Sequence, residues 1–251
     1  MLQTRVIPVL LLRGNGLVKT IKFDKAKYIG DPINAVKIFN EKEVDELLVL
    51  DIDASKENRK PNFELIQNIA SECFMPLGYG GGITELDDIK KLFQLGVEKI
   101  VLNVKALENL KIIEDSSKIF GEQSIVVSID IVKNFLGKYN IYNHAKKKTE
   151  KIDLVEYINQ LQKAGVGEIF INSVDLDGTL KGYDLNLLKL VNKNCKVPFV
   201  ICGGAGNITD FLNAKEFGAS AAAGSLFVYH GPHKAVLINY PSQQELKKLF
   251  K

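Results

Sequence analysis

The sequence predicts a closed barrel of eight parallel strands that alternate with helices, and three observations point to it. The chain has 251 residues, of which 46% are hydrophobic and 25% are charged, as in globular proteins with a large core. Short apolar runs recur about every 31 residues, with amphipathic segments between them. Several residues of the first half recur at a fixed spacing in the second half. An open, doubly wound sheet is the structural alternative, because periodicity does not show closure.

The predicted strands are continuous apolar runs, as expected for parallel strands that are buried on both faces. They span residues 6–12, 47–50, 76–79, 100–102, 125–129, 169–171, 198–201 and 220–223. Helix starts are predicted at Asp31 before Pro32, at Thr84 with Asp87, and at Asn207 with Asp210. We expect one domain, a (β/α)8 or TIM barrel, over residues 1–251.

A repeat divides this barrel into two halves of four units each. The residue pairs that share a spacing of 122 positions are Pro76 and Pro198, Gly81 and Gly203, Gly82 and Gly204, Gly96 and Gly218, and Glu46 and Glu168. One spacing for five such pairs predicts two duplicated half-barrels. Leu11 and Asp130, which end the first and fifth predicted strands, are 119 positions apart.

Charge and composition exclude several classes of function. Lys and Arg total 33 against 30 Asp and Glu, so the net charge of +3 does not favour a nucleic acid or an anionic membrane as partner. The three cysteines and three histidines lack the spacing of metal ligands, and we expect neither a disulfide framework nor a metal site. The sequence shows no signal peptide and no membrane span, and a cytoplasmic location is expected.

Two glycine runs follow predicted strands at equivalent places in the two halves. The first comprises residues 80–82, with Asn103 ending the next strand, and the second comprises residues 203–206, with Gly224 and Ser225 ending the next strand. Glycine lets the backbone approach an anion closely, and the helix that follows favours negative charge. The alternative is a pair of tight turns that need positive φ. The symmetric placement predicts a substrate with a phosphate at each end.

Carboxylates form the second group of candidate residues. Asp51 ends the second strand, Asp130 ends the fifth, and Asp175 and Asp177 follow the sixth. Such groups transfer protons when their pKa suits the reaction, or they cap loops. Metal binding is less favoured, because no histidine lies among them in the sequence. A Ser-His-Asp or Cys-His nucleophile is not predicted either, because no histidine ends a strand.

Together these stretches resemble the cyclase subunit of imidazole glycerol phosphate synthase over most of the chain. The matching stretches are 5–7, 51–55, 80–83, 128–130, 177–179, 182–184 and 203–206. The resemblance implies a glutaminase partner at the N-terminal face of the barrel. Ammonia from that partner would pass through the barrel to a linear substrate with two phosphates. No cofactor is implied.

The resemblance also assigns residues. It implies Asp130 as a catalytic residue and an ammonia gate formed by Arg5, Glu46, Lys99 and Glu168, although such a ring could simply stabilise the barrel floor. The implied substrate-binding residues are Lys19 in the loop after the first strand, Asp51, Gly81, Gly82, Asn103, Asp177, Gly178, Thr179, Gly203, Gly204, Gly224 and Ser225.

Two departures separate this chain from the cyclases. Leu11 stands where the family has its first catalytic aspartate, and the chain continues through His230 to His233 instead of a longer terminal helix. Both features resemble paralogues that work beside a glutaminase and a sugar amidotransferase in surface-polysaccharide synthesis, where the barrel helps to deliver ammonia. The alternatives are a fully active histidine-pathway cyclase and a stand-alone phosphoribosyl aminoimidazole carboxamide isomerase.

Overall fold

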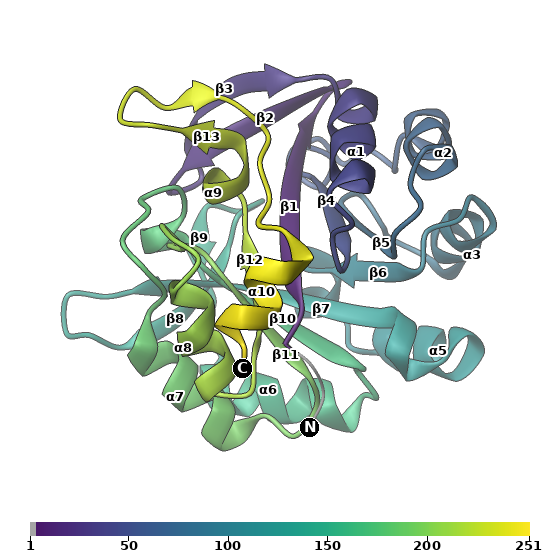
Figure 1. Cartoon of the computed structure of the whole chain (residues 1–251). Coiled ribbons are helices and arrows are strands. Elements are labelled where there is room, and N and C mark those ends of the chain that lie inside the picture. The colour runs from purple at the N-terminus through teal and green to yellow at the C-terminus, as the bar shows by residue number, and fades with distance from the viewer. Residues whose placement is uncertain (1–3) are drawn as a thin grey trace.

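Eight parallel strands close into a barrel in the computed structural model, which describes residues 4–251 (Figure 1). The closure runs through pairing of the last strand with the first, where Val6 is in register with Ala221, and of the fifth with the sixth. In order the strands are β1 (Val6–Arg13), β4 (Leu47–Asp51), β5 (Leu77–Gly80), β6 (Lys99–Leu102), β7 (Ile125–Lys133), β10 (Glu168–Ser173), β11 (Phe199–Cys202) and β12 (Ser220–Ala223). The predicted (β/α)8 barrel is confirmed; the duplication remains a prediction.

Helices surround the barrel. The longer ones are α1 (Pro32–Glu41), α2 (Phe63–Ser71), α3 (Leu86–Gln94), α5 (Lys111–Phe120), α6 (Leu154–Lys163), α7 (Leu185–Asn194), α8 (Asp210–Glu216) and α10 (Gln243–Leu249). Short helical turns follow the barrel strands or precede them: α4 (Val104–Glu108), η1 (Glu122–Ser124), η2 (Val174–Leu176) and α9 (Ser225–Val228). No helix within residues 4–251 is long and apolar enough to cross a membrane.

The predicted helix starts are right for α1 and shifted for the other two. Asp31 caps α1 by accepting from the Asn34 N–H at 2.9 Å. Helix α3 begins at Leu86 with a capping box of Glu85 and Asp88, one residue later than the predicted Thr84 and Asp87. Helix α8 begins at Asp210 with Thr209 as its N-cap, two residues after the predicted Asn207.

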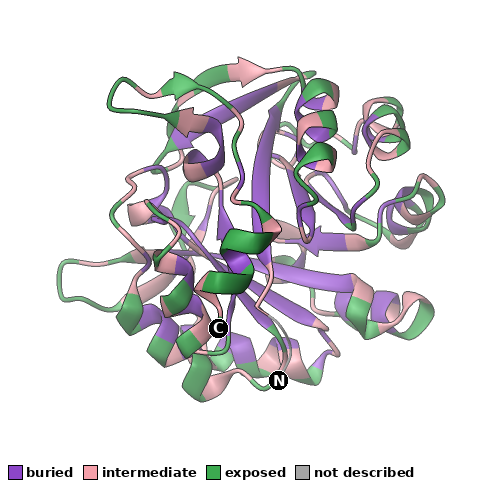
Figure 2. Cartoon of the chain, in the orientation of Figure 1, coloured by how far each residue is buried: buried purple, intermediate pink, exposed green. Residues whose placement is uncertain are grey.

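Two separate apolar cores fill the molecule. The larger lies between the strands and the surrounding helices, so the helices are buried on one side and exposed on the other (Figure 2). The smaller fills the barrel interior with the inward-facing side chains of the strands. Its buried members are Ile7, Val9, Leu11, Val18, Leu48, Val101, Val126, Phe170, Val200, Cys202 and Ala222. The charged side chains that line the barrel cavities lie at its two ends, with Glu46, Lys99 and Glu168 at the floor and Asp51 and Asp130 at the mouth.

Hairpins extend the barrel beyond its first and fifth strands. The pairs are β2 (Gly16–Ile21) with β3 (Asp24–Gly30), and β8 (Tyr139–Asn143) with β9 (Lys148–Thr149); a third hairpin joins β13 (Tyr229–His230) to β14 (Ala235–Val236). The first two meet where the rings of Phe23 and Tyr142 lie 6.5 Å apart. Lys19 therefore lies in strand β2 and is buried, not in a loop as predicted.

Candidate active site and charged ring

Asp130 is buried at the carboxyl end of the barrel, on the wall of a cavity of about 110 Å³. Its carboxylate accepts from Asn103 Nδ2 at 2.9 Å and from Asn172 Nδ2 at 3.4 Å. These amides come from the loop after β6 and from β10, the strands on either side of β7. The Oδ1 atoms of both asparagines are buried and have no hydrogen-bond partner within residues 4–251. A ligand with N–H or O–H groups would satisfy them.

His144 also contacts this carboxylate, and the sequence prediction that no histidine lies among the carboxylates is wrong. Its Nδ1 lies 3.2 Å from Asp130 Oδ2, and the ring lines the same cavity. The residue sits in the turn between β8 and β9, fourteen positions beyond Asp130, so its approach depends on the hairpin folding back over the mouth. The sequence did not predict this contact, because His144 does not directly follow a barrel strand.

Leu11 lines the same cavity and puts a methyl-bearing side chain where a second carboxylate is expected for cyclase chemistry. It is 9% exposed and belongs to the apolar core of the barrel interior. Leucine carries no transferable proton. Two-carboxylate chemistry at this mouth would need another aspartate in its place.

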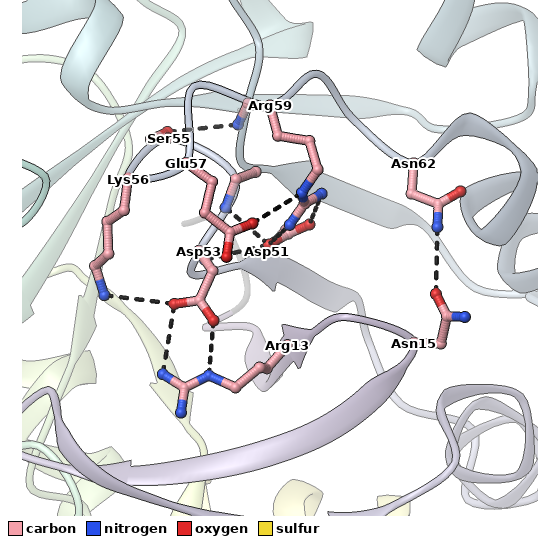
Figure 3. Close-up of polar contacts among 11 residues, drawn as sticks. Arg13, Asn15, Asp51, Asp53, Ser55, Lys56, Glu57, Arg59 and Asn62 are labelled. Atoms are coloured by element: carbon pink, nitrogen blue, oxygen red, sulfur yellow. Dashed lines mark hydrogen bonds and ion pairs between the residues drawn. The ribbon is translucent and has the colours of Figure 1, made fainter.

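Asp51 ends β4 as predicted and lines the cavity, but its carboxylate is already occupied (Figure 3). It accepts from Arg59 Nη1 at 3.0 Å and from the Ala54 N–H at 3.0 Å, which fixes the loop between β4 and α2. The hydrogen bond to Asp51 raises the pKa of Arg59 above its usual range. In this arrangement Asp51 shapes the cavity wall more readily than it transfers a proton.

Asp177 is committed in a similar way on the other half of the mouth. It accepts from Lys19 Nζ at 2.8 Å and from Thr20 Oγ1 at 2.8 Å, and all three side chains are buried. Asp175, which lies within η2, accepts from the Lys133 N–H at 2.7 Å. Asp175 and Asp177 are therefore both held by hydrogen bonds, and neither is free to replace the carboxylate that is absent at Leu11.

A second, smaller cavity of about 10 Å³ lies against the second glycine run. The predicted substrate-binding residues on its wall are Asp177, Gly178, Gly203, Gly204, Gly224 and Ser225, whereas Asp51, Gly81, Gly82 and Asn103 line the larger cavity. Ser225 Oγ is buried without a hydrogen-bond partner within residues 4–251, and a Cβ built on Gly224 would lie 3.2 Å from Lys19 Nζ. Thr179 lines neither cavity, and its hydroxyl donates to the Leu176 carbonyl at 2.8 Å.

The glycine runs are needed by the turns themselves. Gly81 and Gly203 have φ values of +120° and +91°, and a Cβ on either would come within 2.4 Å of a backbone carbonyl. Positive φ at these places therefore supports the alternative of tight turns alongside anion binding.

The expected helix starts do not offer their N–H groups to an anion. Asp88 accepts from the N–H of Thr84 at 3.1 Å, and Asp210 accepts from the N–H of Gly206 at 2.7 Å. Burial alone would raise the pKa of Asp88, but hydrogen bonds from Thr84 and Lys60 outweigh burial and lower it. The N–H groups of Thr84 and Gly206 are thus occupied within the chain, whereas anion binding by the glycine runs themselves remains a prediction.

The four residues of the predicted gate form one closed ring of ion pairs at the N-terminal end of the strands. Lys99 Nζ lies 2.9 Å from both Glu46 and Glu168, and Arg5 pairs with the same two glutamates. Burial would raise the pKa of Glu168, but the charges of Arg5 and Lys99 outweigh burial and lower it. The same contacts raise the pKa of Arg5 against its own desolvation. Both shifts favour the charged forms of Glu168 and Arg5.

A cavity of about 10 Å³, the room that one water molecule needs, lies directly inside this ring. Glu46, Lys99 and Glu168 contribute to its wall, and the rest is apolar, including Val126 and Phe170. Val101 lines both this cavity and the one at the mouth. The ring, the apolar interior and Asp130 thus follow one another from the floor of the barrel to its mouth.

Comparisons with known proteins identify the family of this chain. The model of the histidine biosynthesis protein family matches residues 5–234. A Pseudomonas aeruginosa protein named "Putative imidazole glycerol phosphate synthase subunit hisF2" is 51% identical over 98% of this chain and 99% of its own length. A Leptospira borgpetersenii protein named "Putative imidazole glycerol phosphate synthase subunit HisF" is 50% identical over the full length of both chains.

A Petrotoga mobilis protein named "Imidazole glycerol phosphate synthase subunit HisF" is 36% identical over 94% of both chains. Identity is thus higher to the first two proteins than to this one. The chain belongs to the histidine biosynthesis protein family and is a HisF-like subunit of the imidazole glycerol phosphate synthase type.

Proposed function

We propose that this chain is the ammonia-receiving subunit of a glutamine amidotransferase complex and that it acts on a phosphorylated substrate at the barrel mouth. The observation that carries the proposal is the alignment of a charged ring, an apolar interior and a polar mouth along one barrel. A glutaminase subunit would dock at the N-terminal face, where the ring lies.

The apolar interior suits ammonia in its neutral form. Ammonium carries a charge, and moving such an ion into an apolar interior costs several kcal/mol. The ring would therefore open to admit neutral NH₃, which the interior tolerates, and would close against water. The pairing of all four side chains supports this proposal, in which the paired ring would be the closed form.

The mouth supplies the substrate contacts of the proposal. Gly82 and Asn103 on one half, with Gly204 and Ser225 on the other, would hold the two phosphates through backbone N–H groups and the unpaired Ser225 hydroxyl. Lys19 adds a cation beside the second of these places. Asp130 is the carboxylate left at the mouth for proton transfer.

Ring closure to an imidazole would be slow in this chain. Loss of one general acid or base typically costs about 10² to 10⁴ in rate, and the carboxylates of Asp51 and Asp177 are held by Arg59 and Lys19. This observation favours a second candidate function, in which ammonia is passed on for amidation of a sugar in surface-polysaccharide synthesis.

The proposal is tested by supplying nitrogen in two ways to the chain reconstituted with a synthase glutaminase subunit. The linear bisphosphorylated phosphoribosyl carboxamide is the substrate, and glutamine or an ammonium salt is the nitrogen source. Lys99→Ala should reduce glutamine-dependent product formation and leave ammonium-dependent formation unchanged. Lys37→Ala on helix α1, a surface lysine, is the matched control. Equal rates with glutamine for the wild type and Lys99→Ala would contradict the gate, and full turnover without any nitrogen source would favour the isomerase.

A further inference from the structure

The imidazole of His144 has no role in the function proposed above, yet it lies against the buried carboxylate at the centre of the mouth. Its Nδ1 is 3.2 Å from Asp130 Oδ2, and its side chain is 18% exposed. The ring shares the cavity wall with Asn103 and Asn172.

The fold holds this histidine in place. The preceding residue, Asn143, is fully buried. Its Nδ2 donates to Glu150 at 2.8 Å and its Oδ1 accepts from the Lys146 N–H at 3.0 Å, so both strands of the hairpin and its turn are tied together. The ring of Tyr142 packs near Phe23 of the neighbouring hairpin. His144 is therefore presented to the cavity by an ordered turn.

The hydrogen bonds around Asp130 determine which ring nitrogen of His144 carries the proton and which carries the lone pair. An ionised carboxylate only accepts hydrogen bonds, so the side of each neighbour that faces Asp130 must be a donor. For the two asparagines this side is Nδ2, and for His144 it is Nδ1–H. The lone pair of the imidazole is then on Nε2, as in other carboxylate–histidine pairs.

The acceptors that a ligand would meet at this place include His144 Nε2. They also include the buried Oδ1 atoms of Asn103 and Asn172, which have no partner within residues 4–251. Acceptors of this kind bind N–H donors, and ammonia that arrives through the apolar interior carries three. The side chain of Leu11, which lines the same cavity, offers it no acceptor.

We propose that His144 is the base that takes a proton from ammonia as it adds to a carbonyl carbon of the substrate, with Asp130 as its positioning residue. The nitrogen lone pair forms the new C–N bond, and the π electron pair of the C=O bond moves to oxygen. One N–H proton passes to His144 Nε2, and the imidazolium then protonates that oxygen. The assignment rests on the proposed function, and in this addition step it gives the proton transfer to His144, beside Asp130, instead of to a residue at position 11.

The first test measures turnover of the same bisphosphorylated substrate with an ammonium salt, which bypasses the glutaminase. His144→Gln should lower kcat by about 10²-fold or more, and added imidazole should restore part of the rate of His144→Ala. His230→Gln, on the exposed hairpin, is the matched control and should keep the wild-type rate. A His144→Gln rate within about twofold of the wild type would overturn the assignment.

The second test does not need turnover. The chain has only three histidines, so the imidazole ¹⁵N signals of the full chain are assigned by His144→Gln, His230→Gln and His233→Gln. The assignment predicts protonated Nδ1 and unprotonated Nε2 for neutral His144, and loss of this preference in Asp130→Asn. Protonated Nε2 in the wild type would overturn it. A wild type that shows this tautomer but no turnover would contradict the proposed synthase function and retain the assignment of Nε2 as acceptor.

Discussion

Removing one charge from the ring at the barrel floor should destabilise the whole chain by a predictable amount. Glu168 is 4% exposed and accepts hydrogen bonds from both Arg5 and Lys99. Glu168→Gln keeps the shape of the side chain and removes the charge that balances two cations. Breaking a buried ion pair in this way costs about 3–5 kcal/mol. The lower end applies here, because both cations keep Glu46 and are partly exposed.

This loss converts to a melting temperature through the size of the chain. An unfolding entropy of about 2.1 cal/mol/K per residue corresponds to roughly 0.5 kcal/mol/K for this length, so about 3 kcal/mol lowers Tm by about 6 °C. Glu57→Gln is the matched control, because Glu57 pairs with Arg59 at 3.1 Å but is exposed, and its effect should stay below about 1 kcal/mol.

The assay is thermal unfolding of the chain alone, followed by calorimetry or circular dichroism across a pH series. The pKa of Glu168 is lowered in the folded state, so its contribution is fully present above its unfolded value of 4.5. That contribution is lost as the pH falls through the lower folded value. The difference between wild type and Glu168→Gln should therefore shrink in acid. A Tm for Glu168→Gln within about 1 °C of the wild type at neutral pH would refute this account of the ring.

Three further predictions concern the mouth. Leu11→Asp should raise ammonium-dependent imidazole formation by about 10-fold or more, because it restores an acid or base. Leu11→Asn, of similar size but without a transferable proton, should not, and equal rates for the two variants would contradict the role of this position. Ser225→Ala should leave Tm unchanged or raise it, because the Ser225 hydroxyl is buried without a hydrogen-bond partner within residues 4–251. The same variant should weaken substrate binding by about 10-fold, and an unchanged Kd in calorimetric titration would contradict the proposed phosphate contact. Burial raises the pKa of Cys202 to about 12, so a maleimide should label this thiol far more slowly in the native chain than after denaturation. Equal labelling rates by mass spectrometry would contradict the burial of Cys202 in the barrel interior.

Much of the fold follows from sequence because its signals are local. Continuous apolar runs mark the barrel strands, and the strand from Ser220 to Ala223 is recovered with the predicted bounds. The convergence of the four ring residues could be predicted, because Lys99 and Glu168 are the first residues of strands and Arg5 and Glu46 directly precede strands. The parallel strands of a barrel bring their starts to one end.

The errors arise where the chain leaves the barrel and returns to it. Lys19 and His144 both lie in hairpins, and their contacts with Asp177 and Asp130 span 158 and 14 residues. No periodicity encodes such contacts. The stretch between Ile131 and Asp153 is long and rich in polar residues, and this is the one signal in the sequence that points to a segment folding back over the mouth near His144.

The pairing of Asp51 was also outside what the sequence could show. Its partner Arg59 lies in an irregular loop, whose path depends on the turn of Ala54 and on packing against the first glycine run. A carboxylate at the end of a strand predicts a site, but its partners decide whether it transfers protons or holds a loop.

The most direct test of the central claim follows the nitrogen atom. The chain reconstituted with a synthase glutaminase is given glutamine labelled with ¹⁵N at its side-chain amide, together with excess unlabelled ammonium and the bisphosphorylated substrate. Passage through the barrel predicts that the wild-type product carries ¹⁵N despite the excess. Product labelled only in proportion to ammonium in the bulk solution would show that the nitrogen reaches the mouth from outside.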